Sequence, residues 1–329
     1  MRAFDLVDDC PDMIIADTFF KAEEKIRRPR YKVIVCAVSG GSDSDDVIDI
    51  CSKFDVDNKI KYVWFNPGLE YRATKEHLDF LEQKYDIKIE RVKADKPIPI
   101  ACKQYGVPFL SKYVSEMIYR LQKHNFKWED KPYEELIKEY PNCKGALKWW
   151  CNLHLRRDGK IGTLNIGRDK WLKEFMVENP PTFKISSKCC YYGKKAPSSK
   201  YNASVGTDLV IMGIRKAEGG IRSVKYKSCF LEGKEHDSYF PIFWFSNSIK
   251  NKYDEFYDIK HSRCYTVYGL IRTGCAGCPF NSDFESELAV IEQYEPLLFG
   301  AVNKIFGESY DYTRRYREYA RLRELNQEV

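Results

Sequence analysis

The sequence predicts an α/β protein, with a doubly wound, mostly parallel sheet followed by a helical C-terminal extension. Three strand patterns occur in the first hundred residues, at 33–38, 59–65 and 87–92. The first is an unbroken apolar run, which is typical of a parallel strand buried on both faces. Apolar residues recur at helical spacing over 47–51 and 74–85. This alternation favours a parallel sheet with right-handed crossovers, whose ligands bind beyond the carboxyl ends of the strands.

The rest of the chain is predicted to be mainly helical. Helices are expected at Tyr113–Lys123, at Tyr133–Tyr140, from Lys144 onward and at Ser246–Tyr257, and a later strand at Asp208–Met212. Residues 284–329 also show helical spacing, with a break expected near Gly307. We therefore expect a helical lead-in over 1–30, a main α/β domain over 31–280 and a helical extension over 281–329.

Composition restricts the class of protein. The chain has 329 residues, of which 43% are hydrophobic and 15% aromatic, so it can bury a sizeable core and is not globally disordered. No long apolar stretch or signal peptide is visible, so a cytoplasmic protein with no membrane partner is expected. The net charge of +6 is compatible with binding nucleotides or nucleic acid. Twelve cysteines in a reducing compartment suggest metal or redox chemistry before disulfides.

A glycine-serine loop follows the first strand and precedes the first helix of the α/β pattern. It reads Ser39, Gly40, Gly41, Ser42, Asp43 and Ser44. Such a loop directs backbone N–H groups at one point, where the helix dipole also favours an anion, so it predicts a phosphate site. Asp43 is an acid inside this anion site, which indicates that Mg²⁺ bridges it to phosphate. The loop lacks the Lys-Ser/Thr ending of a Walker loop, and the alternative is a well-capped connection without a ligand.

This loop resembles the SGGxDS pyrophosphate loop (PP-loop) of the ATP pyrophosphatase and PAPS reductase superfamily. The resemblance implies that the chain cleaves ATP between the α- and β-phosphates, or binds a sulfonucleotide (APS or PAPS) in the same cradle. It implies catalytic roles for Asp43 and Ser39 and nucleotide contacts from the whole loop.

Two further segments resemble the PAPS reductase family. Gly68 and Glu70 match its D-T-G-x-E nucleotide turn, although Asn66 and Pro67 replace the first two residues. The family's G-x-R-x-x-E-S-x-x-R segment is matched at Gly213, Arg215, Glu218 and Arg222, with Gly219 in place of serine. Two arginines at a strand end suit an oxyanion, and the alternative is a surface ion-pair cluster. The similarity covers most of 31–280, and the segment from 284 onward resembles the tail of phage-like family members.

Cysteines occur in two close pairs. Cys189 and Cys190 are adjacent, and Cys275 and Cys278 form a C-x-x-C with glycine inside. Four such sulfurs suit a [4Fe–4S] cluster or a tetrahedral zinc ion. The pattern resembles the iron–sulfur site of bacterial adenylyl-sulfate reductases, which implies a [4Fe–4S] cluster on these four residues.

Other cysteines leave alternatives open. Cys264 is a possible replacement for Cys189 or Cys190, and Cys151 is a possible ligand, a sulfur-carrying nucleophile or an ordinary buried thiol. Cys36 and Cys51 lie on apolar faces and are predicted to belong to the core.

Two reactions compete on this reading. A sulfonucleotide reductase, an oxidoreductase, uses a thiolate near its C-terminus, and no cysteine follows Cys278 in this sequence. We therefore favour a transferase that adenylates an acceptor and then passes sulfur to it. A non-catalytic nucleotide-sensing subunit is the third possibility.

The reading also predicts partners. These are an adenine nucleotide, a nucleic-acid or small-molecule acceptor, a sulfur-donor protein and a second copy of the chain in a homo-oligomer. The arginines and tyrosines of 312–323 suit contacts with nucleic acid, and the alternative for them is a solvated amphipathic helix.

Overall fold

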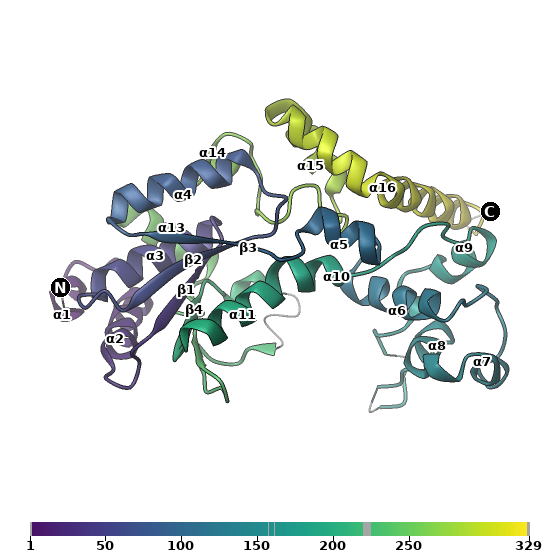
Figure 1. The fold of residues 1–329 in the computed structure, drawn as a ribbon, viewed down its shortest axis with the longest axis horizontal. Helices are drawn as coiled ribbons and strands as arrows, with labels where there is room; N and C mark the ends of the chain where they lie inside the picture. The colour runs from purple at the N-terminus through teal and green to yellow at the C-terminus, as the bar shows by residue number, and fades with distance from the viewer. Residues whose placement is uncertain (1, 157, 161, 220–224, 328–329) are drawn as a thin grey trace. The chain divides into compact units, whose positions relative to one another are not determined.

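A computed structural model describes residues 2–156, 158–160, 162–219 and 225–327. The chain forms two compact units, each built from two stretches of sequence (Figure 1). Unit 1 comprises Met1–Asp95 and Gly193–Cys275, and unit 2 comprises Lys96–Tyr192 and Ala276–Val329.

Unit 1 contains the predicted sheet. In the described residues its strand order is β3-β2-β1-β4-β6-β5. The strands are β1 (Ile34–Val38), β2 (Ile60–Asn66), β3 (Ile89–Lys93), β4 (Leu209–Met212), β5 (Phe230–Leu231) and β6 (Asp237–Tyr239). All neighbouring pairs are parallel except β5 and β6, which are antiparallel. This topology confirms the predicted fold class.

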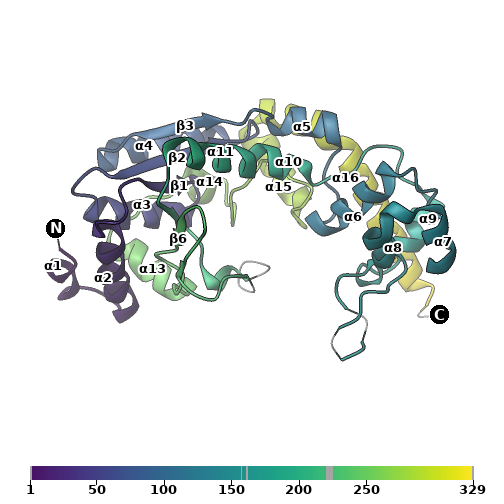
Figure 2. The same ribbon diagram turned by 60° about the horizontal axis from the view of Figure 1, so that its bottom comes forward.

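Helices cover both faces of this sheet. The helices of unit 1 are α1 (Phe4–Val7), α2 (Met13–Arg27), α3 (Ser42–Phe54), α4 (Arg72–Tyr85), α11 (Ala196–Val205), α13 (Asn247–Phe256) and α14 (Arg263–Thr266). Figure 2 shows α2, α3 and α13 on one side of the strands and α11 on the other.

The side chains of β2 alternate between these faces. Trp64 belongs to the main core, whereas the ring of Phe65 meets Tyr201 of α11 at 5.9 Å. In the main core the rings of Phe19 and Phe54 are fully buried and lie 5.9 Å apart. Burial of each ring of this size stabilises the folded state by about 1.5–3 kcal/mol, because it removes apolar surface from water. Cys36 and Cys51 are part of this core, as predicted.

Unit 2 is helical. Its helices are α5 (Ile98–Tyr105), α6 (Lys112–Lys123), α7 (Tyr133–Glu139), α8 (Lys144–Trp150), α9 (Leu172–Glu178), α10 (Lys188–Cys190), α15 (Phe284–Tyr294) and α16 (Pro296–Leu325). Its core includes Trp149, Trp150 and Phe175, and Tyr312 of α16 packs against Phe175 with ring centroids 5.0 Å apart.

The predicted break near Gly307 is wrong. The helical segment is interrupted between Tyr294 and Pro296, and α16 runs through Gly307 without a break. Proline has no N–H to continue the preceding helix but suits the first turn of a new one. A glycine inside a helix costs only about 1 kcal/mol, and the buried Phe306 and Tyr310 on either side of Gly307 hold α16 in place.

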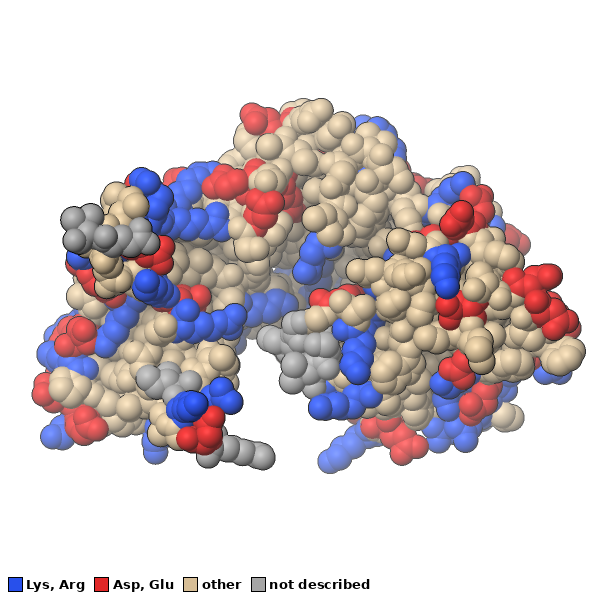
Figure 3. All heavy atoms as spheres, turned by 180° about the vertical axis from the view of Figure 1, so that it is seen from behind, with Lys and Arg blue, Asp and Glu red and all other residues tan. Residues whose placement is uncertain are grey.

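The surface carries both signs of charge. Figure 3 shows Lys and Arg interspersed with Asp and Glu over the face that it presents. None of the helices in the described ranges is both long enough and apolar enough to span a membrane.

Candidate active site

The predicted phosphate loop lies between β1 and α3, at the carboxyl end of β1. Gly40 has φ +68°, and a Cβ at this position would meet the Thr74 side chain at 2.7 Å, so only glycine fits. The Ser39 N–H donates to Ser44 Oγ at 3.1 Å, and the Gly41 N–H donates to Ser39 Oγ at 3.2 Å. The Ser42 N–H donates to the Tyr265 hydroxyl at 3.2 Å. The three loop N–H groups therefore donate to hydroxyl oxygens, and the oxygens of a bound phosphate could accept the same hydrogen bonds.

Asp43 forms the acidic part of this site. Arg215 Nε donates to Asp43 Oδ1 at 2.8 Å, and Arg215 Nη1 donates to Asn247 Oδ1 at 2.9 Å. Burial and the adjacent Glu218 carboxyl raise the pKa of Asp43 to about 6, although Arg215 and Lys250 lower it. The Asp43 side chain is only 16% exposed. Two neighbouring carboxylates suit Mg²⁺, which binds one or two carboxylates together with substrate phosphates.

The predicted G-x-R segment brings Arg215 to this point. A Cβ on Gly213 would lie 2.8 Å from the Asp43 carbonyl oxygen and 3.3 Å from the Ser44 nitrogen. The end of β4 thus packs directly against the backbone of the phosphate loop, and Arg215 follows two residues later. Arg222 lies outside the described residues.

The Asn66–Glu70 turn also lies in unit 1. Gly68 has φ +82°, and its N–H donates to Asn66 Oδ1 at 2.8 Å, so Asn66 closes the turn with its own side chain. Glu70 is buried, and Lys194 Nζ lies 3.7 Å from its carboxylate. Burial raises the pKa of Glu70 to about 7, although Lys194 lowers it. A carboxyl group with this pKa can accept or donate a hydrogen bond to a nucleoside hydroxyl near neutral pH.

A buried set of charges beneath the loop was not anticipated. Asp45, Asp46 and Asp49 of α3 are each at most 5% exposed. Lys250 is also buried and bonds both oxygens of Asp46, at 2.8 and 2.9 Å, as well as Asp254 at 3.0 Å. Because buried carboxylates require partners, three aspartates on the helix after a phosphate loop are a signal that could have predicted such a cation.

Lys250 connects this charge set to the loop. Its ammonium also donates to the Ser42 carbonyl at 3.3 Å. Ligand atoms of Asp46, Asp254 and His261 lie within 4.8 Å of one another, a spacing that a metal ion could use. The Lys250 ammonium already supplies a cation to both carboxylates.

His261 is a second cation in the same set. Its Nδ1 lies 2.8 Å from Asp45 and its Nε2 lies 3.1 Å from Asp254. Both partners accept hydrogen bonds, so both ring nitrogens must carry protons. Burial lowers the pKa of His261, but its hydrogen bonds with Asp254 and Asp45 outweigh burial and raise the pKa to about 9.

This raised pKa predicts a loss of stability at alkaline pH. The charged form of His261 is favoured in the folded state, so its contribution is complete below about pH 6.5, the ordinary histidine value. The contribution is lost as the pH rises from there through about 9, by an amount on the order of 1–3 kcal/mol. Urea unfolding at several pH values will measure it, with His261→Gln as the comparison. The free energy of unfolding of His261→Gln is expected to fall less over this pH range than that of the wild type. Parallel curves for the two proteins would contradict a charged His261 in the folded state.

Arg215 gives a second prediction. Its planar guanidinium bonds Asp43 and Asn247 through different nitrogens, which the single ammonium of lysine cannot reproduce. Arg215→Lys is expected to weaken Mg²⁺–nucleotide binding about tenfold, measured by calorimetric titration. Arg263→Lys, at an exposed arginine of the same unit, is the control. Equal nucleotide affinities for the two variants would indicate that Arg215 belongs to a surface ion-pair cluster and does not contact the nucleotide.

The cysteines of unit 2 form a group. Cys102 and Cys190 are within hydrogen-bonding reach of the Cys189 thiol, and Cys278 is close enough to affect it electrostatically. The hydrogen bond from Cys102 and burial raise the pKa of Cys189 well above its usual value, and Cys190 opposes them. Several thiols gathered in a buried place fit a metal centre, because a bound metal deprotonates its sulfur ligands. Cys102 was not among the predicted ligands, since no spacing in the sequence links it to Cys189.

The backbone explains how Cys102 and Cys189 meet. The Val107 N–H donates to the Lys184 carbonyl, and the Ser186 N–H donates to the Val107 carbonyl, both at 2.9 Å. Gly106 permits this contact, because a Cβ there would lie 2.4 Å from the Lys184 carbonyl oxygen. The two hydrogen bonds hold α5 beside α10.

The C-x-x-C segment is also shaped by glycine. Gly277 has φ +60°, its N–H donates to Glu287 at 3.1 Å and its carbonyl accepts from Tyr310. A Cβ at Gly277 would meet the Tyr310 hydroxyl at 2.7 Å. These contacts fix Cys278 in unit 2, whereas Cys275 is the last residue of unit 1.

The remaining candidate cysteines lie elsewhere. Cys264 is buried in unit 1, with Sγ 3.7 Å from Thr74 Oγ1. Cys151 packs against the core of unit 2, where burial raises the pKa of its thiol. All twelve cysteines belong to the described residues, and none forms a disulfide.

The arginine–tyrosine segment of α16 makes contacts within unit 2. Tyr316 and Tyr319 pack on Phe175, with ring centroids 5.5 Å away in both cases. Arg314 pairs with Glu285 at 2.9 Å, and Arg323 pairs with Glu178 at 3.0 Å. These contacts favour the amphipathic-helix reading over a nucleic-acid contact.

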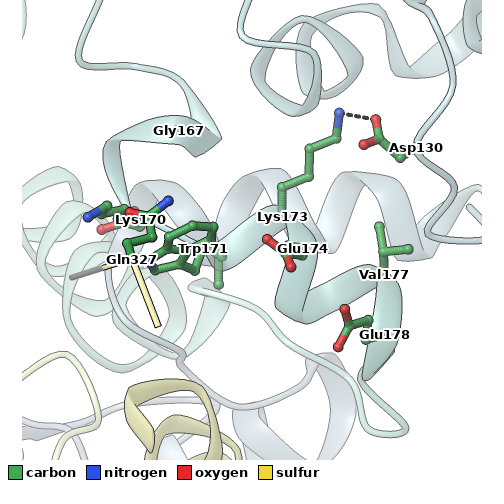
Figure 4. Close-up of a pocket in the computed structure, with 11 residues that line it drawn as sticks. Asp130, Gly167, Lys170, Trp171, Lys173, Glu174, Val177, Glu178 and Gln327 are labelled. Atoms are coloured by element: carbon green, nitrogen blue, oxygen red, sulfur yellow. Dashed lines mark hydrogen bonds and ion pairs between the residues drawn. The ribbon is translucent and has the colours of Figure 1, made fainter. Parts of the chain in front are cut away.

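A cavity of about 530 Å³ lies in unit 2, beside α9 (Figure 4). Trp171 and Lys173 are among its lining residues, and Lys173 pairs with Asp130 at its edge. None of the predicted site residues lines it, so it has no part in the site described above.

Comparisons with known proteins give structural likenesses only. No protein-family model matches the sequence, and no curated protein matches it. A phosphoadenylyl-sulfate (PAPS) reductase from Candida auris, solved with phosphate, is 11% identical at a TM-score of 0.42, over 77% of this chain and 87% of its own. An NH₃-dependent NAD synthetase from Campylobacter jejuni is 12% identical at 0.37, over 91% and 95%.

A U34-tRNA thiolase from Methanococcus maripaludis, solved with its [4Fe–4S] cluster, is 13% identical at a TM-score of 0.38. This match covers 94% of the present chain and 79% of the thiolase. Likeness at this level assigns no function.

Proposed function

We propose that the chain is a PP-loop enzyme that activates an acceptor with ATP and then transfers sulfur to it. The observation that carries the proposal is the arrangement of Asp43, Glu218 and Arg215 around the N-terminus of α3. Two adjacent carboxylates and a guanidinium at a phosphate loop provide for both Mg²⁺ and phosphate charge.

In this proposal the loop binds the phosphates of ATP. The N–H groups of Gly41 and Ser42 exchange their present hydroxyl partners for phosphate oxygens. Asp43 and Glu218 hold Mg²⁺, and Ser39 and Arg215 contact phosphate oxygens. An acceptor oxygen attacks the α-phosphorus, the bond to the bridging oxygen breaks, and pyrophosphate leaves with that electron pair.

The cysteines supply the sulfur side of the proposal. Cys189, Cys190, Cys275 and Cys278 are the proposed ligands of a [4Fe–4S] cluster, with Cys102 as the alternative to Cys275 because it adjoins Cys189. When bound, such a cluster would supply or hold the sulfide that displaces the adenylate. The protein groups around it set its burial and keep water from the thiolates.

ATP–pyrophosphate exchange tests the proposal. Anaerobically purified protein with Mg²⁺ is expected to incorporate labelled pyrophosphate into ATP in the presence of its acceptor, and to bind ATP more tightly than APS or PAPS. Tighter binding of APS or PAPS, with release of sulfite in the presence of a thiol reductant, would instead establish a reductase. Binding of ATP without any turnover would favour the nucleotide-sensing subunit.

A further inference from the structure

The excess positive charge of this chain is concentrated in two short segments of unit 2. Residues 96–123 and 184–192 hold seven of the 54 basic residues and one of the 48 acidic residues. The rest of the chain therefore has 47 of each sign. The whole net charge of +6 belongs to these two segments.

The two segments form one surface. The backbone hydrogen bonds of Val107 with Lys184 and Ser186 join them, and α5 packs beside α10. We call the exposed and partly exposed residues of 96–123 and 184–192 the basic tyrosine surface. Lys103, Lys112, Lys123 and Lys184 are exposed on it. Its single acid, Glu116, lies 2.9 Å from Arg120 and 4.0 Å from Lys188.

Tyrosines lie among these cations. The rings of Tyr105 and Tyr192 are stacked, with centroids 4.7 Å apart and planes within 9°. Lys96 Nζ lies 5.1 Å from the centroid of Tyr105 and 4.8 Å from that of Tyr192, and it donates to the Tyr105 hydroxyl at 2.7 Å. The stack is therefore held rigidly while both rings remain partly exposed.

More aromatic surface continues from this stack. Tyr191 is 51% exposed, and its ring stands at 83° to that of Tyr192, with centroids 5.1 Å apart. Lys188 lies 5.3 Å from the centroid of Tyr119. Flat rings with ammonium groups beside them are a suitable surface for nucleobases joined by phosphates.

We propose that the basic tyrosine surface binds a single-stranded nucleic acid, with bases on Tyr105, Tyr191 and Tyr192 and phosphates on the surrounding lysines. Bases in a duplex present no free face to a ring, so the strand must be unpaired here. An acidic protein segment would use the lysines but gain little from three tyrosines.

The basic tyrosine surface lies next to the cysteine group of unit 2. Cys102 lies one helical turn before Tyr105, and Tyr191 directly follows Cys189 and Cys190. A bound base would therefore lie close to the cysteine group. Its role as the sulfur acceptor rests on the proposed function, whereas binding of the strand does not.

Fluorescence anisotropy with a labelled single strand of about 20 mixed nucleotides, as RNA and as DNA, tests the proposal. The double variant Tyr105→Ala/Tyr192→Ala is expected to bind about tenfold or more weakly. Tyr105→Phe/Tyr192→Phe keeps the rings and is expected to bind within about twofold of the wild type. Lys188→Ala is expected to lower the slope of log Kd against log salt by about 0.7.

Matched controls are available in unit 2. Lys170→Ala removes a lysine that also lies over an aromatic ring, that of Trp171, and Tyr294→Ala removes a partly exposed tyrosine of α15. Both are expected to bind the strand as the wild type does. Thermal melting will show whether each variant is folded, and the phenylalanine and Lys188 variants still decide the question if the alanine pair unfolds.

The outcomes separate this proposal from the proposed function. Binding that depends on the tyrosines, in a protein without ATP–pyrophosphate exchange, would support the surface and overturn the function. ATP–pyrophosphate exchange in a protein that does not bind the strand would support the proposed function and overturn the surface. Equal binding of the alanine pair and the wild type, or equal binding of a duplex, would overturn the surface. If polyglutamate displaces the strand and binding does not depend on the tyrosines, the surface is instead a site for an acidic protein.

Discussion

Serine in place of Cys189 is expected to remove iron from anaerobically purified protein and to lower its melting temperature. Cys189 is buried within a group that includes Cys102, Cys190 and Cys278, and a cluster that only the folded chain can bind adds directly to stability. Wild-type protein is expected to be brown, with about four irons per chain and a broad absorbance near roughly 400 nm. The variant should lose most of the iron and melt about 5 °C or more below the wild type.

Iron content and melting temperature also test the control variant and identify the fourth ligand. Cys10→Ser changes a partly buried thiol of unit 1, near the Asp12 carbonyl, and should keep both iron and melting temperature. Loss of iron in Cys275→Ser but not in Cys102→Ser would confirm the predicted ligand set, and the opposite result would replace Cys275 with Cys102. About one zinc and no iron in the wild type would overturn the cluster. Iron retained in Cys189→Ser but lost in Cys264→Ser would keep the cluster and change its ligand.

Alanine in place of Asp43 is expected to abolish Mg²⁺-dependent turnover of ATP, by a factor of about 100 or more. The proposal assigns Asp43 and Glu218 to the metal ion, and removal of one carboxylate leaves Mg²⁺ without half of its protein ligands. The same change removes a negative charge from the phosphate site and the partner of Arg215 Nε. Binding of ATP without Mg²⁺ is therefore expected to be kept or strengthened. Pyrophosphate exchange and calorimetric titration measure the two effects separately.

Asp95→Ala provides the matched control for this change. Asp95 is an exposed aspartate of unit 1, and its partner, Lys200, lies 2.8 Å away. Because exposed pairs contribute little, this variant should have wild-type turnover and stability. Full turnover in Asp43→Ala would contradict the role of the phosphate loop in ATP cleavage. A variant that unfolds can be replaced by Asp43→Asn, which keeps the side-chain shape and is also expected to lose turnover.

Local patterns of the sequence determined most of the fold and the phosphate loop. A buried parallel strand needs a continuous apolar run, and residues 33–38 have one, so β1 and the start of α3 follow from the residues themselves. The same is true of Gly40, whose positive φ and close contact with Thr74 leave room for glycine alone. The interruption at Pro296 was also readable, because the chemistry of proline is local, whereas Gly307 was given too much weight.

Only the tertiary structure decided which distant residues complete the site. The carboxylate of Asp46 is stable in the core because Lys250 reaches it from 204 positions further along the chain, and Tyr265 contacts Ser42 from 223 positions away. Cys102 meets Cys189 only because the backbone at Val107 pairs with residues 184–186. Spacing along a chain reports which neighbours share a helix face or a strand. It carries no record of partners that come together through the packing of separate elements, and buried charges and thiols depend on those partners.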